Sequence, residues 1–300
     1  MKFLRPEYLS KGDRIAIVAP SYSHPEGTVE RACRFIRECG YIPVPGPNSG
    51  KTGSGIPDYA GSAEERAAEL REVLESPEYG AILCTRGGYG AIHLLNLLPA
   101  ESFRRNPKWL IGFSDITTLH SASLAAGVMS IHGKMCKNIG DDEFDILEGR
   151  LPRYEIPHNE FNVEGRTQGT LMGGNMISMA ALTGGRYDFL LHEGIILFVE
   201  EVGEGFHAID RLMNMLLNNV NFRNVKGLVF GEFTDCPADL PFSCVEQMLD
   251  RYTKNLGIPV CYGFPSGHGE INLPFIEGAA VSLEVTQEHT QLTYLCSHFF

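Results

Sequence analysis

Residues 109–117 read Trp-Leu-Ile-Gly-Phe-Ser-Asp-Ile-Thr, an apolar run that ends at a glycine and is followed by a serine. A helix-like segment, 117–126, begins directly afterwards. This pattern predicts a strand-to-helix corner with Ser114 at its apex. A serine there projects its hydroxyl off the sheet, and the amide of the next residue, Asp115, turns outward as an oxyanion donor. The competing interpretation is that Ser114 only caps the helix, because serine is a favoured N-cap.

Short apolar runs alternate with amphipathic segments around this corner, as is typical of an α/β fold with a parallel sheet and helices on both faces. We therefore expect a flavodoxin- or Rossmann-like N-terminal domain, residues 1–150, with ligands gathered at the C-terminal strand ends. A capping box formed by Ser62 and Glu65 opens one of its helices. The expected elements are strands at 14–19, 41–44 and 80–84 and helices at 27–39 and 62–74.

The alternation is lost over residues 151–168, which we interpret as a linker between domains. The remaining chain, 169–300, predicts a smaller C-terminal domain of mixed β/α structure. Its expected elements are strands at 194–200, 227–233, 279–285 and 291–296 and helices near 173–183, 208–219 and 242–254.

Two later segments carry the groups that a serine nucleophile needs. Five apolar residues, 195–199, predict a buried strand that ends in the acids Glu200 and Glu201, and a buried acid is costly unless it is paired. His268 lies between two glycines, which leave its ring open to close approach. Taken alone, this glycine-flanked histidine is typical of a surface turn. Serine, glutamate and histidine in this order form a coherent set, in which the glutamate holds the imidazole and the imidazole takes the serine proton.

With these segments in view, the chain resembles the serine LD-carboxypeptidases, a family that includes the microcin-immunity hydrolases. The resemblance runs from about residue 12 nearly to the C-terminus, and one departure is Lys134, where the family more often has proline. The matching motifs lie at 17–21, 59–62, 86–90, 112–115, 132–133, 169–175, 199–204 and 267–269.

The resemblance implies a catalytic triad of Ser114, His268 and Glu200, with Glu200 rather than Glu201 as the acid. It also places Gly174 and Asn175 near the bound peptide and implies a homodimer.

The segment 86–90, Arg-Gly-Gly-Tyr-Gly, lacks both the Gly-x-Gly-x-x-Gly spacing and the Lys-Ser/Thr tail of phosphate-binding loops. In an amide hydrolase, the amide of Gly87 or Gly88 could join that of Asp115 in stabilising the oxyanion. The sequence does not choose between the two glycines, and a plain glycine turn is the alternative. Arg86 is a candidate for binding a substrate carboxylate or for a structural ion pair.

Composition bounds the function further. The 300 residues include 25 basic and 37 acidic side chains, and the net charge of −12 argues against nucleic acid or an anionic membrane as the main partner. Eight scattered cysteines without a Cys-x-x-Cys pair predict reduced thiols. Without a His-x-x-x-His or His-Glu-x-x-His pair, no catalytic zinc is expected. Hydrolysis by a serine nucleophile needs no cofactor. The absence of a leader-like start and of a membrane-length apolar run predicts a cytoplasmic protein.

The function expected from all this is hydrolysis of an LD-peptide bond, releasing the terminal D-alanine of a cell-wall muropeptide tetrapeptide in murein recycling. One alternative is hydrolysis of peptidyl- or aminoacyl-nucleotide antibiotics, for which aromatic residues would stack on the base. The single tryptophan, Trp109, precedes the nucleophile corner, which weakens that alternative. The other is a non-catalytic ligand-binding protein on a doubly wound sheet.

Overall fold

The structure is a computed structural model that describes residues 3–51 and 58–295. The chain divides into two compact units. The N-terminal unit extends to Leu151 and also includes Pro274–Glu277, whereas the C-terminal unit comprises Pro152–Leu273 and resumes at Gly278. Each unit is built around one sheet, and the first sheet is mostly parallel, so the predicted α/β fold is confirmed. Within the described part of the chain, no helix has the length and apolar character needed to cross a membrane.

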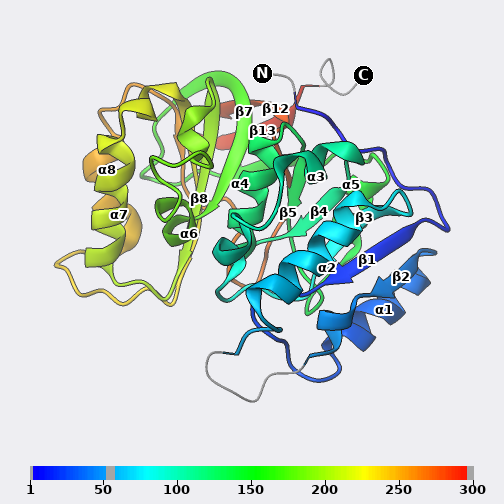
Figure 1. Cartoon of the computed structure of the whole chain (residues 1–300). Coiled ribbons are helices and arrows are strands. Elements are labelled where there is room, and N and C mark those ends of the chain that lie inside the picture. The colour runs from blue at the N-terminus through cyan, green and yellow to red at the C-terminus, as the bar shows by residue number, and fades with distance from the viewer. Residues whose placement is uncertain (1–2, 52–57, 296–300) are drawn as a thin grey trace. The chain divides into compact units, whose positions relative to one another are not determined.

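The N-terminal unit contains a six-stranded sheet in the order β11-β5-β4-β3-β1-β2 (Figure 1). Strands β1 to β5 are parallel to their neighbours, and β11 is antiparallel to β5. Apolar runs such as that of β4 are buried throughout, as expected for parallel strands covered on both faces. The elements are β1 (Arg14–Val18), α1 (Thr28–Glu38), β2 (Ile42–Pro45), η1 (Pro47–Gly50), α2 (Ala63–Glu75), β3 (Tyr79–Cys84), η2 (Ala91–Leu94), α3 (Ala100–Arg105), β4 (Trp109–Gly112), η3 (Ser114–Ile116), α4 (Thr117–Ala125), β5 (Ser130–His132), α5 (Asp141–Leu147) and β11 (Phe275–Glu277).

The predicted capping box opens α2. The Glu65 amide donates to Ser62 Oγ at 3.2 Å, and the Ser62 amide donates to Glu65 Oε2 at 2.9 Å. Two amides at the helix start, which have no partner within a helix, are thereby satisfied. The helix then buries Leu70 and Leu74.

The C-terminal unit contains a seven-stranded sheet in the order β10-β9-β8-β7-β12-β13-β6. The strands from β10 to β7 are parallel, and those from β7 to β6 are antiparallel. The elements are β6 (Arg153–Pro157), β7 (Gly165–Asn175), α6 (Met176–Ala180), η4 (Phe189–Leu191), β8 (Ile195–Val202), α7 (Phe206–Asn218), η5 (Val220–Asn224), β9 (Val225–Thr234), α8 (Val245–Thr253), β10 (Val260–Cys261), β12 (Ala280–Val285) and β13 (His289–Tyr294).

Two segments of this unit differ from the sequence-based expectation. The segment 151–168 contains the edge strand β6, whose Tyr154 and Ile156 are buried while the alternate residues are exposed. The helix expected near 173–183 begins only at Met176, because Gly173 still belongs to β7. A Cβ on Gly173 would lie 1.9 Å from the Phe198 carbonyl oxygen. Close pairing with β8 therefore keeps the glycines in the strand.

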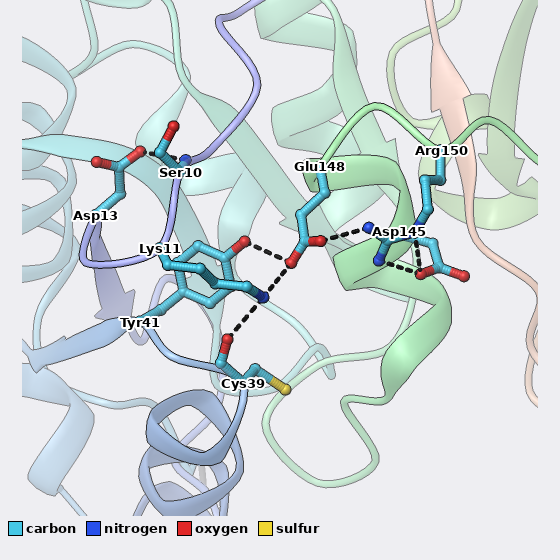
Figure 2. A network of polar contacts seen from close by, with 8 residues as sticks. All are labelled: Ser10, Lys11, Asp13, Cys39, Tyr41, Asp145, Glu148 and Arg150. Carbon is cyan, nitrogen blue, oxygen red and sulfur yellow. Dashed lines mark hydrogen bonds and ion pairs between the residues drawn. The ribbon is translucent and has the colours of Figure 1, made fainter.

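A polar network ties the end of α5 to the segments that directly precede β1 and β2 (Figure 2). Glu148 accepts hydrogen bonds from Lys11, from the Tyr41 hydroxyl at 2.7 Å, and from Arg150. Arg150 also donates through Nε to Asp145 Oδ1 at 2.9 Å. The bonds from Lys11, Tyr41 and Arg150 lower the pKa of Glu148 to about 2. Glu148 thus stays ionised and holds the chain where it leaves the unit.

Candidate active site

Ser114 has a backbone conformation that L-residues rarely adopt. Strand β4 ends at Gly112, Phe113 is extended, and Ser114 has φ 64° at the start of η3. In the described part of the chain, the only other non-glycine residue with positive φ is Asp235. The left-handed region costs a non-glycine residue roughly 1–2 kcal/mol, and such strain concentrates at functional sites. The backbone matches the elbow on which serine hydrolases present a nucleophile.

The capping interpretation of Ser114 does not fit this geometry. An N-cap residue has extended dihedral angles and accepts a backbone N–H through its side chain. The cap positions of η3 and α4 are Phe113 and Ile116, and neither makes a side-chain capping bond.

A buried histidine supports the strand end before Ser114. His120 is fully buried, and its two ring nitrogens lie 2.8 Å from the Gly112 carbonyl oxygen and 2.8 Å from Ser130 Oγ. Burial lowers the pKa of His120 to about 4, although the bond to Gly112 partly opposes that shift. The neutral ring therefore donates to Gly112 and accepts from Ser130. The sequence does not single out His120, and its contact with Gly112 is visible only in the folded chain.

Of the two candidate oxyanion glycines, Gly87 faces the serine. A Cβ on Gly87 would lie 2.9 Å from Ser114 Cβ, 3.1 Å from Ser114 Oγ and 3.4 Å from the Asp115 amide nitrogen. A Cβ on Gly88 would instead lie 2.5 Å from the Tyr22 ring, and Gly88 has φ +105°. Only a residue without a side chain at position 87 lets the loop approach the Ser114 hydroxyl this closely.

The side chain of Asp115 fastens this loop to the nucleophile corner. Its Oδ2 accepts from Ser21 Oγ at 2.6 Å and from the Ala91 amide at 2.8 Å. The buried guanidinium of Arg66, which sequence reasoning missed, donates to the carbonyl oxygens of Pro20 and Gly90. These bonds connect the end of β1, the glycine-rich loop and the turn that carries Ser114. The only sequence signal near Arg66 was the capping box beside it.

Arg86 lies at the exposed edge of the same loop. Its Nη1 donates to the Ser23 carbonyl at 3.1 Å, and its guanidinium lies 5.8 Å from the centroid of the Tyr22 ring. These contacts give Arg86 a structural role within its unit. Binding of a substrate carboxylate by Arg86 stays a prediction.

In the C-terminal unit, Glu200 and His268 form a hydrogen-bonded pair. Glu200 Oε2 lies 2.7 Å from His268 Nδ1, with the Glu200 side chain fully buried and that of His268 18% exposed. Burial lowers the pKa of His268, but the bond to Glu200 and the charges of Glu200, Glu201 and Glu232 outweigh it, so the net pKa is raised. The carboxylate therefore favours a ring that carries its proton on Nδ1 and can accept another on Nε2.

Glu201 serves a different purpose from its neighbour. The Glu201 carboxylate accepts from the amides of Ile177 and Val202, both at 2.8 Å, and from Asn175 Nδ2 at 2.9 Å. Burial raises the pKa of Glu201, and these hydrogen bonds oppose the increase. Glu201 thus supports the start of α6 and does not contact the His268 ring.

Asn175 and Gly174, the predicted peptide contacts, lie at the end of β7. The Asn175 amide donates to Glu201, and its oxygen accepts from the Ser178 amide at 3.2 Å, capping α6. Gly174 is paired with Val199 of β8. A role of either residue in binding substrate stays a prediction.

Glu232 also belongs to the surroundings of His268, and sequence reasoning missed it. It follows the buried run of β9 much as Glu200 follows that of β8, so its signal was an acid at the end of an apolar strand. In residues 3–51 and 58–295, no group of three or more His, Cys, Asp or Glu side chains is arranged to hold a metal ion.

Comparison with known proteins identifies the family. Residues 15–133 match the LD-carboxypeptidase N-terminal domain, and residues 168–283 match the LD-carboxypeptidase C-terminal domain. A putative carboxypeptidase of Synechocystis is 32% identical over 295 residues, covering 94% of this chain and 95% of that protein. The murein tetrapeptide carboxypeptidase of Pseudomonas aeruginosa is 30% identical over 242 residues, covering 75% of this chain and 79% of that protein.

Two further relatives bear on the substrate. The crystal structure of a muramoyltetrapeptide carboxypeptidase from Oxalobacter formigenes is similar with a TM-score of 0.84 and 25% identity, over 94% of this chain and 98% of that one. The microcin C7 self-immunity protein MccF of Escherichia coli is 25% identical over 333 residues, covering 95% of this chain and 94% of that protein. Both domain matches and the full-length relatives agree with the resemblance seen in the sequence. The chain belongs to the LD-carboxypeptidase family.

Proposed function

We propose that this protein is a serine LD-carboxypeptidase that releases the terminal D-alanine from a muropeptide tetrapeptide. The observation that carries the proposal is the left-handed backbone of Ser114 at a strand-to-helix corner. Strain at that position has a purpose if the hydroxyl is a nucleophile. The murein tetrapeptide carboxypeptidase among the relatives supports the substrate.

In the proposed mechanism, Ser114, His268 and Glu200 act as a triad. Ser114 Oγ attacks the carbonyl carbon of the scissile bond, and His268 Nε2 takes the hydroxyl proton. Glu200 accepts a hydrogen bond from His268 Nδ1–H, orients the ring and stabilises the imidazolium. The protonated ring then gives its proton to the amine of the departing D-alanine. Water, deprotonated by His268, hydrolyses the acyl-enzyme and restores Ser114.

Two backbone amides are proposed to stabilise the tetrahedral oxyanion. One is the amide of Asp115, the residue after the nucleophile, as is usual for this type of corner. The other is the amide of Gly87, because Gly87 and not Gly88 packs against Ser114 and the Asp115 nitrogen. Removal of one such donor typically costs about 10²–10³ in kcat.

The direct test is hydrolysis of a muropeptide tetrapeptide by the purified protein. We expect D-alanine release from a tetrapeptide ending in D-alanine and none from its epimer ending in L-alanine. The Ser114→Ala variant should remain folded and lose activity by several orders of magnitude. Near-full activity of that variant would refute the triad.

A second candidate, hydrolysis of an aminoacyl or peptidyl nucleotide, is favoured by the relative MccF and by an aromatic cluster near the glycine-rich loop. In that cluster, the Tyr22 and Tyr59 rings lie 5.5 Å apart, the Tyr89 and His93 rings lie 5.3 Å apart, and Tyr89 is 49% exposed. Trp109, by contrast, is buried and donates through Nε1 to the Glu7 carbonyl. Assaying an aminoacyl nucleotide and the tetrapeptide in parallel distinguishes the two activities.

A serine-directed fluorophosphonate probe separates both activities from a non-catalytic binding protein. We expect labelling of the native chain and none of Ser114→Ala. The homodimer and the cytoplasmic location stay predictions, to be measured by light scattering of the purified protein and by cell fractionation.

A further inference from the structure

Glu232 is built into the loop that carries His268. It lies in β9, which runs parallel to β8, the strand of Glu200. The Glu232 amide donates to the Ser266 carbonyl at 3.0 Å, so this part of β9 pairs with the start of the loop 266–269. A Cβ on Gly231 would lie 2.4 Å from the same carbonyl oxygen. The backbone of β9 and the loop therefore run in direct contact.

The Glu232 side chain occupies the space beside the residue after His268. A Cβ on Gly269 would lie 1.7 Å from Glu232 Oε2 and 2.8 Å from Glu232 Oε1, so the carboxylate packs directly against the backbone of Gly269. On the other side of the histidine, a Cβ on Gly267 would lie 3.2 Å from Glu200 Oε2 and 3.3 Å from Glu232 Cβ. The loop 267–269 thus passes between two carboxylate side chains.

Both carboxylates keep an oxygen without a hydrogen-bond donor. Within the described residues, Glu200 Oε1 and Glu232 Oε2 are buried and make no hydrogen bond. A buried charged oxygen without a donor is destabilising unless another charge compensates it. In this unit, the titratable groups that act on His268 are Glu200 and Glu201 of β8 and Glu232 of β9. The compensating charge that forms among these acids is the imidazolium of His268.

We propose that Glu232 is a positioning residue for His268, supporting its loop by packing against Gly269 and adding a second negative charge beside the protonated ring. Glu200 holds the ring directly and fixes its tautomer. Glu232 acts on the ring indirectly, by supporting the loop that carries it and by the electrostatic attraction between its negative charge and the imidazolium. Its effect on catalysis rests on the proposed function, whereas its effect on the titration of His268 does not.

Two substitutions separate the packing from the charge. Glu232→Gln keeps the shape that packs against Gly269 but removes the negative charge. The imidazolium loses stabilisation, so the pKa of His268 should fall by about half a unit to one unit, at the low end of the effect of a nearby opposite charge. That shift corresponds to a roughly 3- to 10-fold lower proton affinity of the ring. Glu232→Ala removes both contributions, so its kcat on the pH plateau should be lower than that of Glu232→Gln.

The matched control is Glu270→Gln. Glu270 lies in the same stretch of chain and is exposed. Glu270→Gln therefore removes the same charge as Glu232→Gln but leaves the contact between β9 and the His268 loop intact. We expect its His268 titration and kcat to equal those of the wild type.

The experiment follows the imidazole Cε1 proton of His268 by NMR as a function of pH in the full-length protein, with His268→Asn used to assign the signal. The acid limb of kcat/KM is measured on the same variants. A shift to lower pH in Glu232→Gln but not in Glu270→Gln supports the proposal. Equal titration curves for both variants would overturn it. If the wild type hydrolyses no tetrapeptide while the NMR shift is present, the proposed substrate is wrong and the role of Glu232 stands.

Discussion

Replacing Ser114 by glycine is expected to abolish hydrolysis while making the protein more stable than the Ser114→Ala variant. Serine and alanine at φ 64° both bear the left-handed cost of roughly 1–2 kcal/mol. Glycine does not bear this cost, but it loses more backbone entropy on folding, by roughly 0.5–1 kcal/mol. The difference leaves Ser114→Gly more stable than Ser114→Ala by about 0.5–1 kcal/mol.

The control is a glycine substitution where the backbone is right-handed. Ala68 is exposed in the middle of α2, and Ala68→Gly should lower the free energy of unfolding by about 1 kcal/mol. Urea unfolding of the wild type and the three variants, compared at equal m-values, measures these differences. D-alanine release and fluorophosphonate labelling are measured on the same preparations.

The reasoning can be refuted because glycine, relative to alanine, should raise the free energy of unfolding at position 114 and lower it at position 68. If Ser114→Gly is less stable than Ser114→Ala by the amount that Ala68→Gly loses, the corner is not strained and the argument for the nucleophile fails. If either Ser114 variant keeps the wild-type rate, Ser114 does not react with the substrate.

Four further outcomes are expected. Glu200→Gln should lower kcat by about 10²–10⁴-fold, whereas Glu201→Gln should mainly lower the free energy of unfolding, by about 1–2 kcal/mol, because Glu201 accepts buried N–H groups; equal losses of kcat would show that the acid is misassigned. The rate should rise with pH through a His268 pKa above the ordinary 6.5, since its net shift is upward and the neutral ring is the base; a limb below 6.5 would contradict this. The pKa of His120 is lowered from 6.5 to about 4, so between these values the unfolded chain binds the extra proton, and stability should fall by about 3 kcal/mol as the pH drops from 6.5 to 4, and less in His120→Gln. An equal change of the urea midpoint between pH 7 and pH 5 in that variant and in the wild type would count against it. Dialysis against a chelator should leave hydrolysis intact because the proposed nucleophile is a serine; loss of activity restored by zinc would replace that mechanism.

Features that depend on a few neighbouring residues were predictable from the sequence. The apolar run that ends at Gly112 determines a strand end, and the following residues determine the corner at Ser114. The capping box of Ser62 and Glu65 determines where α2 begins. Sterics and hydrogen bonds over three or four residues decide such features, so they can be read without knowing the rest of the fold.

Two strand segments, β6 and the end of β7, could not be predicted because the local sequence signal for a strand is weak or misleading there. The edge strand β6 alternates buried and exposed residues between two prolines, and it was interpreted as a linker. Gly173 and Gly174 were assigned to a helix, although pairing with β8 keeps them extended. In both cases the deciding partner strand lies 20 or more residues away along the chain, and local propensity does not include it.

The choice among similar side chains came only from tertiary packing. Sequence alone proposed the order of Ser114, Glu200 and His268. The roles of Glu200 and Glu201 differ because Glu200 bonds to His268 whereas Glu201 bonds to the start of α6. Gly87 is distinguished from Gly88 by what a Cβ would meet, and Glu232 is recognised only because β9 brings it to the loop of His268. The physical reason is that burial, charge and hydrogen-bond geometry depend on groups brought together from distant segments of the chain. Two residues of the same type therefore look alike in the sequence and acquire different roles only in the fold.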